Sequence, residues 1–167
     1  TSINGIWLRN MDLDSYYNLI HPYIDEAVKG DFDKKKIARV VQQRANTLNE
    51  IPGMLDFFDT FPAYSDDLYV NKKMKTDQTV ALESLKASRE VLEAIPEAEW
   101  TEDNLHAKLM ELPAKLGRKN GQVLFPLRLA ITGKQFTPGG AIEIADILGK
   151  ERTLARLDQS IAQLEQK

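Results

Sequence analysis

The chain contains no cysteine, so neither a disulfide framework nor a thiolate metal site can be built from its 167 residues. It also lacks any run of roughly 20 apolar residues, the length that an α-helix needs to cross a bilayer. No charged-then-apolar leader opens the sequence, and nothing in it indicates export. These absences predict a cytoplasmic protein without a membrane partner, since reduced conditions suit a chain free of disulfides.

An excess of positive charge is lacking as well, because the formal net charge is -3 at pH 7. General polyanion binders are usually basic overall, so the composition argues against a generic polyanion binder, and no DNA partner is expected. If the basic residues met in space, one face would be positive, although charge alone favours two ordinary solvated faces. The basic residues gather in two stretches: Lys34, Lys35, Lys36, Arg39 and Arg44, and then Lys115, Arg118, Lys119, Arg128, Lys134, Lys150, Arg152 and Arg156.

Catalytic patterns are also missing. The two histidines, His21 and His106, have no neighbour that suggests a proton relay, and no nucleophile elbow or zinc spacing occurs. The stretches that begin at Gly133 and Gly149 lack the serine or threonine of a phosphate-binding loop. The sequence therefore predicts no catalytic residue, no metal ligand and no cofactor within this chain.

What the chain does contain is apolar residues at helical spacing along most of its length. In the first third, Asp14 is expected to cap a helix that Pro22 bends or restarts. A second helix is expected over Lys34–Asn49, and a short core-filling helix in the aromatic segment Leu55–Phe61. Only residues 3–8 have the pattern of a possible strand.

Further along, Thr76 or Asp77 is expected to open a long helix that stops near Pro96. The later helices are predicted from Thr101 to Gly117, from Gly121 to Thr132, from Ala141 to Leu148, and from Gly149 to the end of the chain. Because each helix carries a single apolar stripe, they must pack on one another as an all-α fold. Turn-forming residues between Pro62 and Lys75 predict a joint between two packed helical subdomains.

Arg44 is the residue that helical geometry singles out. At 3.6 residues per turn it falls among Ile37, Val41 and Leu48, in the apolar stripe of the predicted helix. A guanidinium there is costly unless it is paired or faces a cleft. One interpretation is a buried ion pair with a carboxylate. The other is an arginine at the mouth of a cleft between the subdomains, offered to a planar polar ligand such as a nucleobase.

Several motifs in order resemble the C-terminal anticodon-binding region of bacterial-type glutamyl-tRNA synthetases. The resemblance covers nearly the whole chain. It is carried by Ile3-Asn-Gly-Ile-Trp-Leu-Arg9, Arg44-Ala-Asn-Thr-Leu-Asn-Glu-Ile-Pro52, Pro126-Leu-Arg-Leu-Ala-Ile-Thr-Gly133, Thr137-Pro-Gly139 and Leu148-Gly-Lys-Glu-Arg152.

This resemblance implies an α-helical cage that holds an unstacked anticodon loop. Residues 1–10 would end the stem-contact region, residues 11–68 would form the first helical subdomain and residues 69–167 the second. The catalytic motifs of the family are absent, so the chain would be a non-catalytic, monomeric part of a longer ligase. That parent would join glutamate to its tRNA with ATP and magnesium.

Residue roles follow from the same resemblance. Arg44 falls where an arginine favours the final base of a glutamate anticodon, which implies tRNA(Glu) as the partner and leaves tRNA(Gln) as a second one. Arg128 falls at a position that contacts the anticodon loop, Thr137 and Gly140 in the loop that lines a base pocket, and Lys36 near the loop backbone. The alternative to an RNA-reading module is a helical protein-interaction scaffold in which the arginines are structural.

Overall fold

The computed structural model describes residues 7–45 and 48–166, which group into two compact units. The first unit contains the chain up to Thr60 together with Phe136–Gly139, and the second contains the rest. Over the described residues the regular structure is helical, apart from one isolated antiparallel bridge between Asn71 and Thr76. The predicted all-α fold is therefore confirmed.

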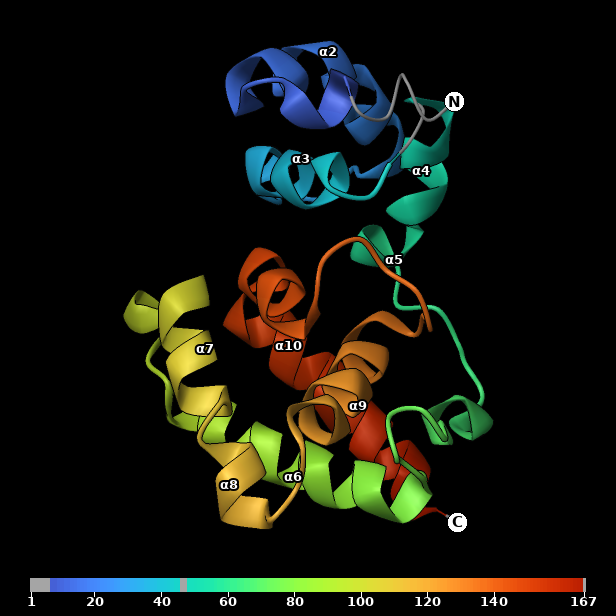
Figure 1. The fold of residues 1–167 in the computed structure, drawn as a ribbon, viewed down its shortest axis with the longest axis vertical. Helices are drawn as coiled ribbons and strands as arrows, with labels where there is room; N and C mark the ends of the chain where they lie inside the picture. Colours follow the sequence, from blue (N-terminus) through green and yellow to red (C-terminus); the bar gives the residue numbers. More distant parts are fainter. Residues whose placement is uncertain (1–6, 46–47, 167) are drawn as a thin grey trace. The chain divides into compact units, whose positions relative to one another are not determined.

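The first unit is built on α2 (Leu13–Ala27) and α3 (Lys34–Gln42), which pack on each other (Figure 1). Three short elements complete it, the 3-10 helix η1 (Leu48–Glu50), α4 (Ile51–Met54) and α5 (Asp56–Asp59). Its core is apolar and aromatic throughout. The largest fully buried side chains here are Tyr16, Ile20, Ile24, Ile37, Ile51, Leu55, Phe57 and Phe58.

The start of α2 differs from its prediction by a few residues. Asp12 is the cap, and its side chain accepts a hydrogen bond of 3.0 Å from the backbone N–H of Ser15. Asp14 lies inside the first turn and forms an ion pair with Lys35 instead. The helix runs through Pro22, which is exposed, while Ile20 and Ile24 on either side of it are buried and hold the helix against the core.

Two further predictions are wrong in this unit. Trp7 and Leu8, expected in a possible strand, lie in a short helical stretch over residues 7–10, while residues 3–6 of that segment lie outside the described residues. The helix expected over Lys34–Asn49 ends at Gln42. The backbone N–H groups of both Arg44 and Ala45 donate to the carbonyl of Val41, so the chain tightens into a turn there.

A carboxylate holds the loop between α2 and α3 in place. The two oxygens of Asp59, the last residue of α5, accept hydrogen bonds from the backbone N–H groups of Lys29 and Gly30, at 2.6 and 2.8 Å. This fixes where α3 begins relative to α2, and Asp33 then caps α3 by accepting from the N–H of Lys36.

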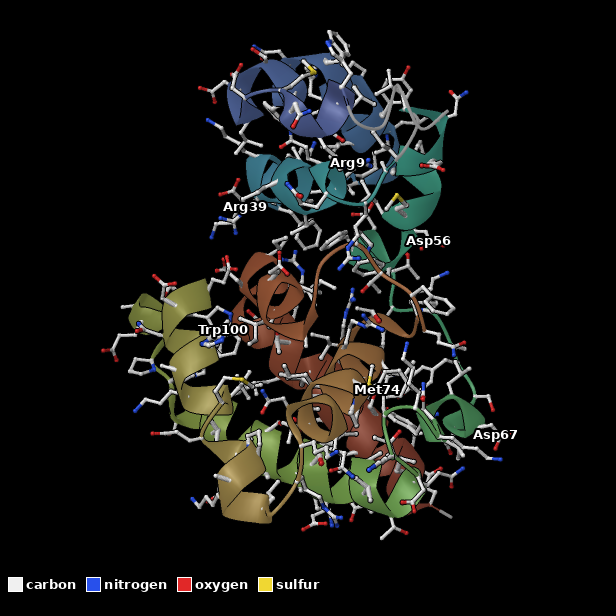
Figure 2. The ribbon with its side chains drawn as sticks, viewed as in Figure 1. Arg9, Arg39, Asp56, Asp67, Met74 and Trp100 are labelled. Carbon is white, nitrogen blue, oxygen red and sulfur yellow. The ribbon has the colours of Figure 1, made fainter. Side chains whose placement is uncertain are left out.

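The second unit consists of a packed core of α6 (Gln78–Ala94), α9 (Asn120–Thr132) and α10 (Ala141–Glu165). The helices α7 (Glu102–Leu109) and α8 (Leu112–Leu116) flank this core (Figure 1), and the 3-10 helices η2 (Asp66–Tyr69) and η3 (Glu97–Glu99) precede α6 and α7. Trp100 is labelled beside α7 in Figure 2, and its indole N–H donates to the Ala145 carbonyl of α10 at 2.9 Å.

The helix ends of the second unit confirm most of the predicted signals. Asp77 and Thr101 cap α6 and α7 with their side chains. Gly117 and Gly133 end α8 and α9 in the left-handed conformation, with φ of 68° and 69°. Inside α10, Gly149 has φ of 84° and separates two helical segments, as predicted.

One predicted helix is divided in two. The leucine stripe from Leu105 to Leu116 is shared between α7 and α8, which are separated at Met110 and Glu111. Pro113 stands at the start of α8, where its missing N–H costs nothing, and it favours a new helix over a continuation. None of the helices in the described ranges is long and apolar enough to cross a membrane.

The segment after residue 60 belongs to the second unit because buried hydrogen bonds tie it to α10. The hydroxyl of Tyr64 lies 2.6 Å from that of Tyr69 and donates to Ser160 Oγ at 2.7 Å. Gln163 donates to the Asp66 carboxylate. The compact units divide at Thr60, and the subdomain limit at residues 68 and 69 stays a prediction.

Candidate nucleic-acid interface

In the first unit the turn after α3 carries the principal candidate residue, Arg44. Its side chain is exposed, and it forms no ion pair with any carboxylate of the described residues. The interpretation of Arg44 as part of a buried ion pair is therefore wrong. The reason is that α3 ends before Arg44, so the residue never enters the apolar stripe that a longer helix would have made.

The turn that carries Arg44 is anchored by Gln42, a residue that the sequence analysis did not single out. Gln42 is 5 % exposed, and its amide donates to the carbonyls of Leu8 and Met11 at 3.0 and 2.8 Å. A buried amide with two acceptors at fixed positions holds the end of α3. The burial of Gln42 could have been predicted from the sequence, because Gln42 lies four residues after Ala38 and therefore on the buried side of the helix.

The other basic residues of α3 lie in different surroundings. Lys34 donates to Asp25 at 2.8 Å, and this bond lowers the pKa of the Asp25 carboxyl and raises that of the lysine. Lys35 pairs with Asp14, so two of the lysines are partly neutralised by α2. Lys36 is half-buried beside its capping residue, and Arg39 projects outward from α3 (Figure 2).

In the second unit Arg128 holds the loop that follows α9. It is half-buried, and its guanidinium donates to the Gln135 carbonyl at 2.7 Å. Thr132 strengthens the same loop, since its hydroxyl donates to the Arg128 carbonyl and accepts from the N–H of Lys134, at 2.7 and 3.1 Å. Together these bonds fix the path of the chain that leaves α9.

Thr137 and Gly140 fall at the two ends of the next segment. Thr137 is half-buried and groups with the first unit, and its hydroxyl donates to the Gly139 carbonyl at 3.1 Å. Gly140 begins α10 in the second unit, where its N–H donates to the Glu143 carboxylate at 3.0 Å. Lys36, Arg44 and Thr137 thus belong to one compact unit, and Arg128 and Gly140 to the other.

The surroundings of Gly140 in the second unit are acidic. A hollow of about 450 Å³ beside it is lined by Glu102, Asp103 and Glu143, with His106, Leu124, Ala141 and Ile142. Three carboxylates there repel phosphate, so this hollow does not suit an RNA backbone. No group of histidine and carboxylate side chains in the described ranges is arranged to hold a metal ion.

Comparison with known proteins points to one class of RNA-binding module. The family model for the anticodon binding domain matches residues 15–161. The glutamate–tRNA ligase of Clostridium tetani is 47% identical over 162 residues, which covers 97% of this chain and 33% of that protein. The glutamate–tRNA ligase of Clostridium acetobutylicum is 42% identical over 164 residues, again 33% of its length. The chain therefore spans about a third of these curated relatives.

Solved structures share the fold. A crystal structure of a glutamate tRNA ligase from Elizabethkingia meningosepticum, in complex with its amino acid, is similar with a TM-score of 0.75 and 21% identity. The similarity covers 96% of this chain and 31% of that one. The glutamate-tRNA synthetase of Elizabethkingia anophelis gives a TM-score of 0.70 at 18% identity, so the helical arrangement is retained where the sequences have diverged.

Proposed function

Because the chain belongs to the anticodon-binding-domain family and matches the C-terminal region of glutamate–tRNA ligases, we propose that it recognises the anticodon loop of tRNA(Glu). In this proposal Arg44 reads the last base of the anticodon. The observation that supports it is the exposed guanidinium of Arg44, held on a turn that Gln42 anchors.

The chemistry of Arg44 suits a nucleobase. A guanidinium is a planar fork of five N–H donors, which matches two acceptors on one base edge and can stack on a base plane. RNA sequence is read mainly where bases are unstacked and single-stranded, as in an anticodon loop. An exposed arginine that forms no ion pair among residues 7–45 and 48–166 keeps these donors available, whereas Lys34 and Lys35 form ion pairs with carboxylates of α2.

The remaining candidate residues take supporting roles in this proposal. Lys36 provides charge for the loop phosphates and carries no sequence information. Arg128 fixes the chain after α9 through the Gln135 carbonyl and presents the base-lining segment with Thr137 and Gly140. The carboxylates of the acidic hollow beside Gly140 repel phosphate, so the RNA backbone is not expected to bind there.

The longer protein is part of the same proposal. We propose that it uses ATP and magnesium to join glutamate to its tRNA in the cytoplasm, and that this chain supplies anticodon choice as a monomer without catalysing the reaction. We propose further that Arg44 favours tRNA(Glu) over tRNA(Gln), which is the preference that the family resemblance implies for an arginine at this position.

The test compares Arg44→Gln with Arg39→Gln, because both positions are exposed arginines of the first unit. Binding of anticodon stem-loops that differ only in the last anticodon base is measured by fluorescence anisotropy at fixed salt. We expect the unchanged chain and Arg39→Gln to prefer the glutamate anticodon, and Arg44→Gln to lose roughly tenfold of that preference. All three should weaken as salt rises, because phosphate contacts release counterions.

Equal discrimination by Arg44→Gln and the unchanged chain would show that Arg44 does not read the last base. Binding of cognate and unrelated stem-loops with the same affinity, or of neither, would favour the protein-interaction scaffold over the RNA-reading module. Circular dichroism of each variant checks that the helical fold is retained.

A further inference from the structure

Phe136 differs from every other phenylalanine of the chain in the exposure of its side chain to solvent. Phe57, Phe58 and Phe125 are buried and Phe32 and Phe61 are half-buried, whereas the Phe136 side chain is 84% exposed. Burying a phenylalanine side chain stabilises a fold, and this chain does without that contribution at Phe136. A single exposed apolar side chain is common on a protein surface, so the exposure of Phe136 gains its meaning from the segment that carries the ring.

The backbone on both sides of Phe136 is constrained. Before it, the Gln135 carbonyl accepts from the guanidinium of Arg128 at 2.7 Å. After it, Thr137 donates to the Gly139 carbonyl, Pro138 is buried with its φ fixed by the ring, and Gly139 has φ of 76°. The exposed ring is therefore carried by a pre-organised segment, which reduces the entropy lost when it binds a partner.

We propose that Phe136 is a stacking platform for one unstacked base of the anticodon loop, an inference that rests on the proposed function. An aromatic face can stack on any base, and a nearby cation can hold the adjoining phosphate. Lys134, a half-buried cation, lies two residues before Phe136. The two residues next to Phe136 in the sequence, Gln135 and Thr137, are polar. A base needs only one ring face, whereas a protein partner needs an apolar patch of a few hundred Å².

The test uses the chain with anticodon stem-loops in which 2-aminopurine replaces one loop base at a time, because its fluorescence is quenched by stacking. Phe136→Leu keeps an apolar side chain but removes the aromatic face, and Phe136→Trp keeps the face. We expect one loop position to be quenched on binding to the unchanged chain and to Phe136→Trp. With Phe136→Leu the quench should disappear and the affinity should fall roughly tenfold.

Val70→Ala is the matched control, since Val70 is also an exposed apolar residue, 54% accessible, on a segment of the second unit. It should leave both the quench and the affinity unchanged. The salt dependence of binding should be the same in Phe136→Leu and the unchanged chain, because stacking releases no counterions.

The stacking proposal is overturned if Phe136→Leu binds the stem-loop as tightly as the unchanged chain and quenches the same base. That result leaves the proposed function intact, since RNA binding itself persists. If the unchanged chain binds no stem-loop, both proposals fail. If Phe136→Leu changes only the sedimentation mass of the chain, the ring contacts a second copy and not a base, which also overturns the proposal.

Discussion

The two compact units each bury a tyrosine completely, but they differ in whether its hydroxyl forms a hydrogen bond. In the first unit Tyr16 is 1% exposed, and its hydroxyl has no hydrogen-bond partner within the described residues. In the second unit Tyr69 is 0% exposed, and its hydroxyl lies 2.6 Å from that of Tyr64. The contrast separates a unit in which the buried tyrosine is held by apolar packing alone from one in which the buried tyrosine is also hydrogen-bonded.

The direction of the hydrogen bonds around Tyr69 follows from the last acceptor. Ser160 donates to the carbonyl of Ala130 at 2.7 Å, and a carbonyl can only accept. Ser160 must therefore accept from Tyr64, whose single proton is then used, so Tyr69 is the donor to Tyr64. This relay joins the segment after residue 60 to α10 and α9, and it specifies one arrangement of the three.

The relay bears on how firmly each unit holds its own candidate residues. The loop after α9, held by Arg128, belongs to a framework whose elements are fixed by buried polar contacts. The turn that carries Arg44 depends on a single buried amide, that of Gln42. Changes in the second unit should therefore cost more stability when they break a specific contact, and three pairs of variants test this expectation.

The largest effect is expected for Gly133→Ala, which tests how tightly the loop after α9 is held. Gly133 has φ of 69°, and a Cβ added there would lie 2.6 Å from the backbone carbonyl oxygen of Pro62. Left-handed strain and the clash together should lower the free energy of unfolding by about 3 kcal/mol. Urea unfolding followed by circular dichroism measures the change.

Gly117→Ala separates the two causes. Gly117 has nearly the same φ, 68°, but nothing lies within 4 Å of an added Cβ, so only the conformational cost of about 1 kcal/mol remains. Equal losses for the two variants would show that Pro62 moves away from the added Cβ without cost, so that the clash adds nothing to the conformational strain.

A smaller effect is expected for Ser160→Ala, which removes the centre of the relay. The change leaves the Ala130 carbonyl without its donor and Tyr64 without its acceptor, and should cost about 2 kcal/mol. Ser88→Ala is the control, because Ser88 Oγ is equally buried and has no hydrogen-bond partner in the described part of the chain. If both variants unfold at the same urea concentration, the relay does not stabilise the unit.

These contacts also mark where sequence reasoning succeeds. Asp77, Thr101, Gly117, Gly133 and Gly149 were assigned correctly because each helix end is set by the chemistry of the residue itself. The family motifs, spread over most of the chain, were enough to identify the anticodon-binding fold.

Sequence reasoning failed where a distant contact decides the structure. No glycine or proline marks the end of α3 in the sequence. The end is fixed instead by hydrogen bonds from the Gln42 amide to the carbonyls of Leu8 and Met11. Helical spacing alone therefore placed Arg44 on a buried face that does not exist. The bond from Arg128 to Gln135 is likewise invisible in the sequence, since it depends on how the loop folds back.

The smallest effects are expected when each buried tyrosine is replaced by phenylalanine, which tests the opening contrast directly. Tyr69→Phe removes the first donor of the relay and should lower the free energy of unfolding by about 1 kcal/mol. Tyr16→Phe removes a hydroxyl that has no partner in the described residues, so it should be neutral or slightly stabilising. Urea unfolding at neutral pH measures both, and equal losses would contradict the contrast.

Unfolding at alkaline pH is a second test of the buried Tyr16 hydroxyl, and it compares the unchanged chain with Tyr16→Phe. Burial raises the pKa of Tyr16 to about 12, from 10.0. The folded state therefore favours the neutral phenol, and this contribution is complete below pH 10 and is lost as the pH rises toward 12. Near pH 10.5 the unchanged chain should have lost roughly 0.8 kcal/mol that Tyr16→Phe retains. If the two lose stability in parallel between neutral pH and that point, Tyr16 ionises in the folded chain as freely as in the unfolded one, and its hydroxyl has found a partner or water.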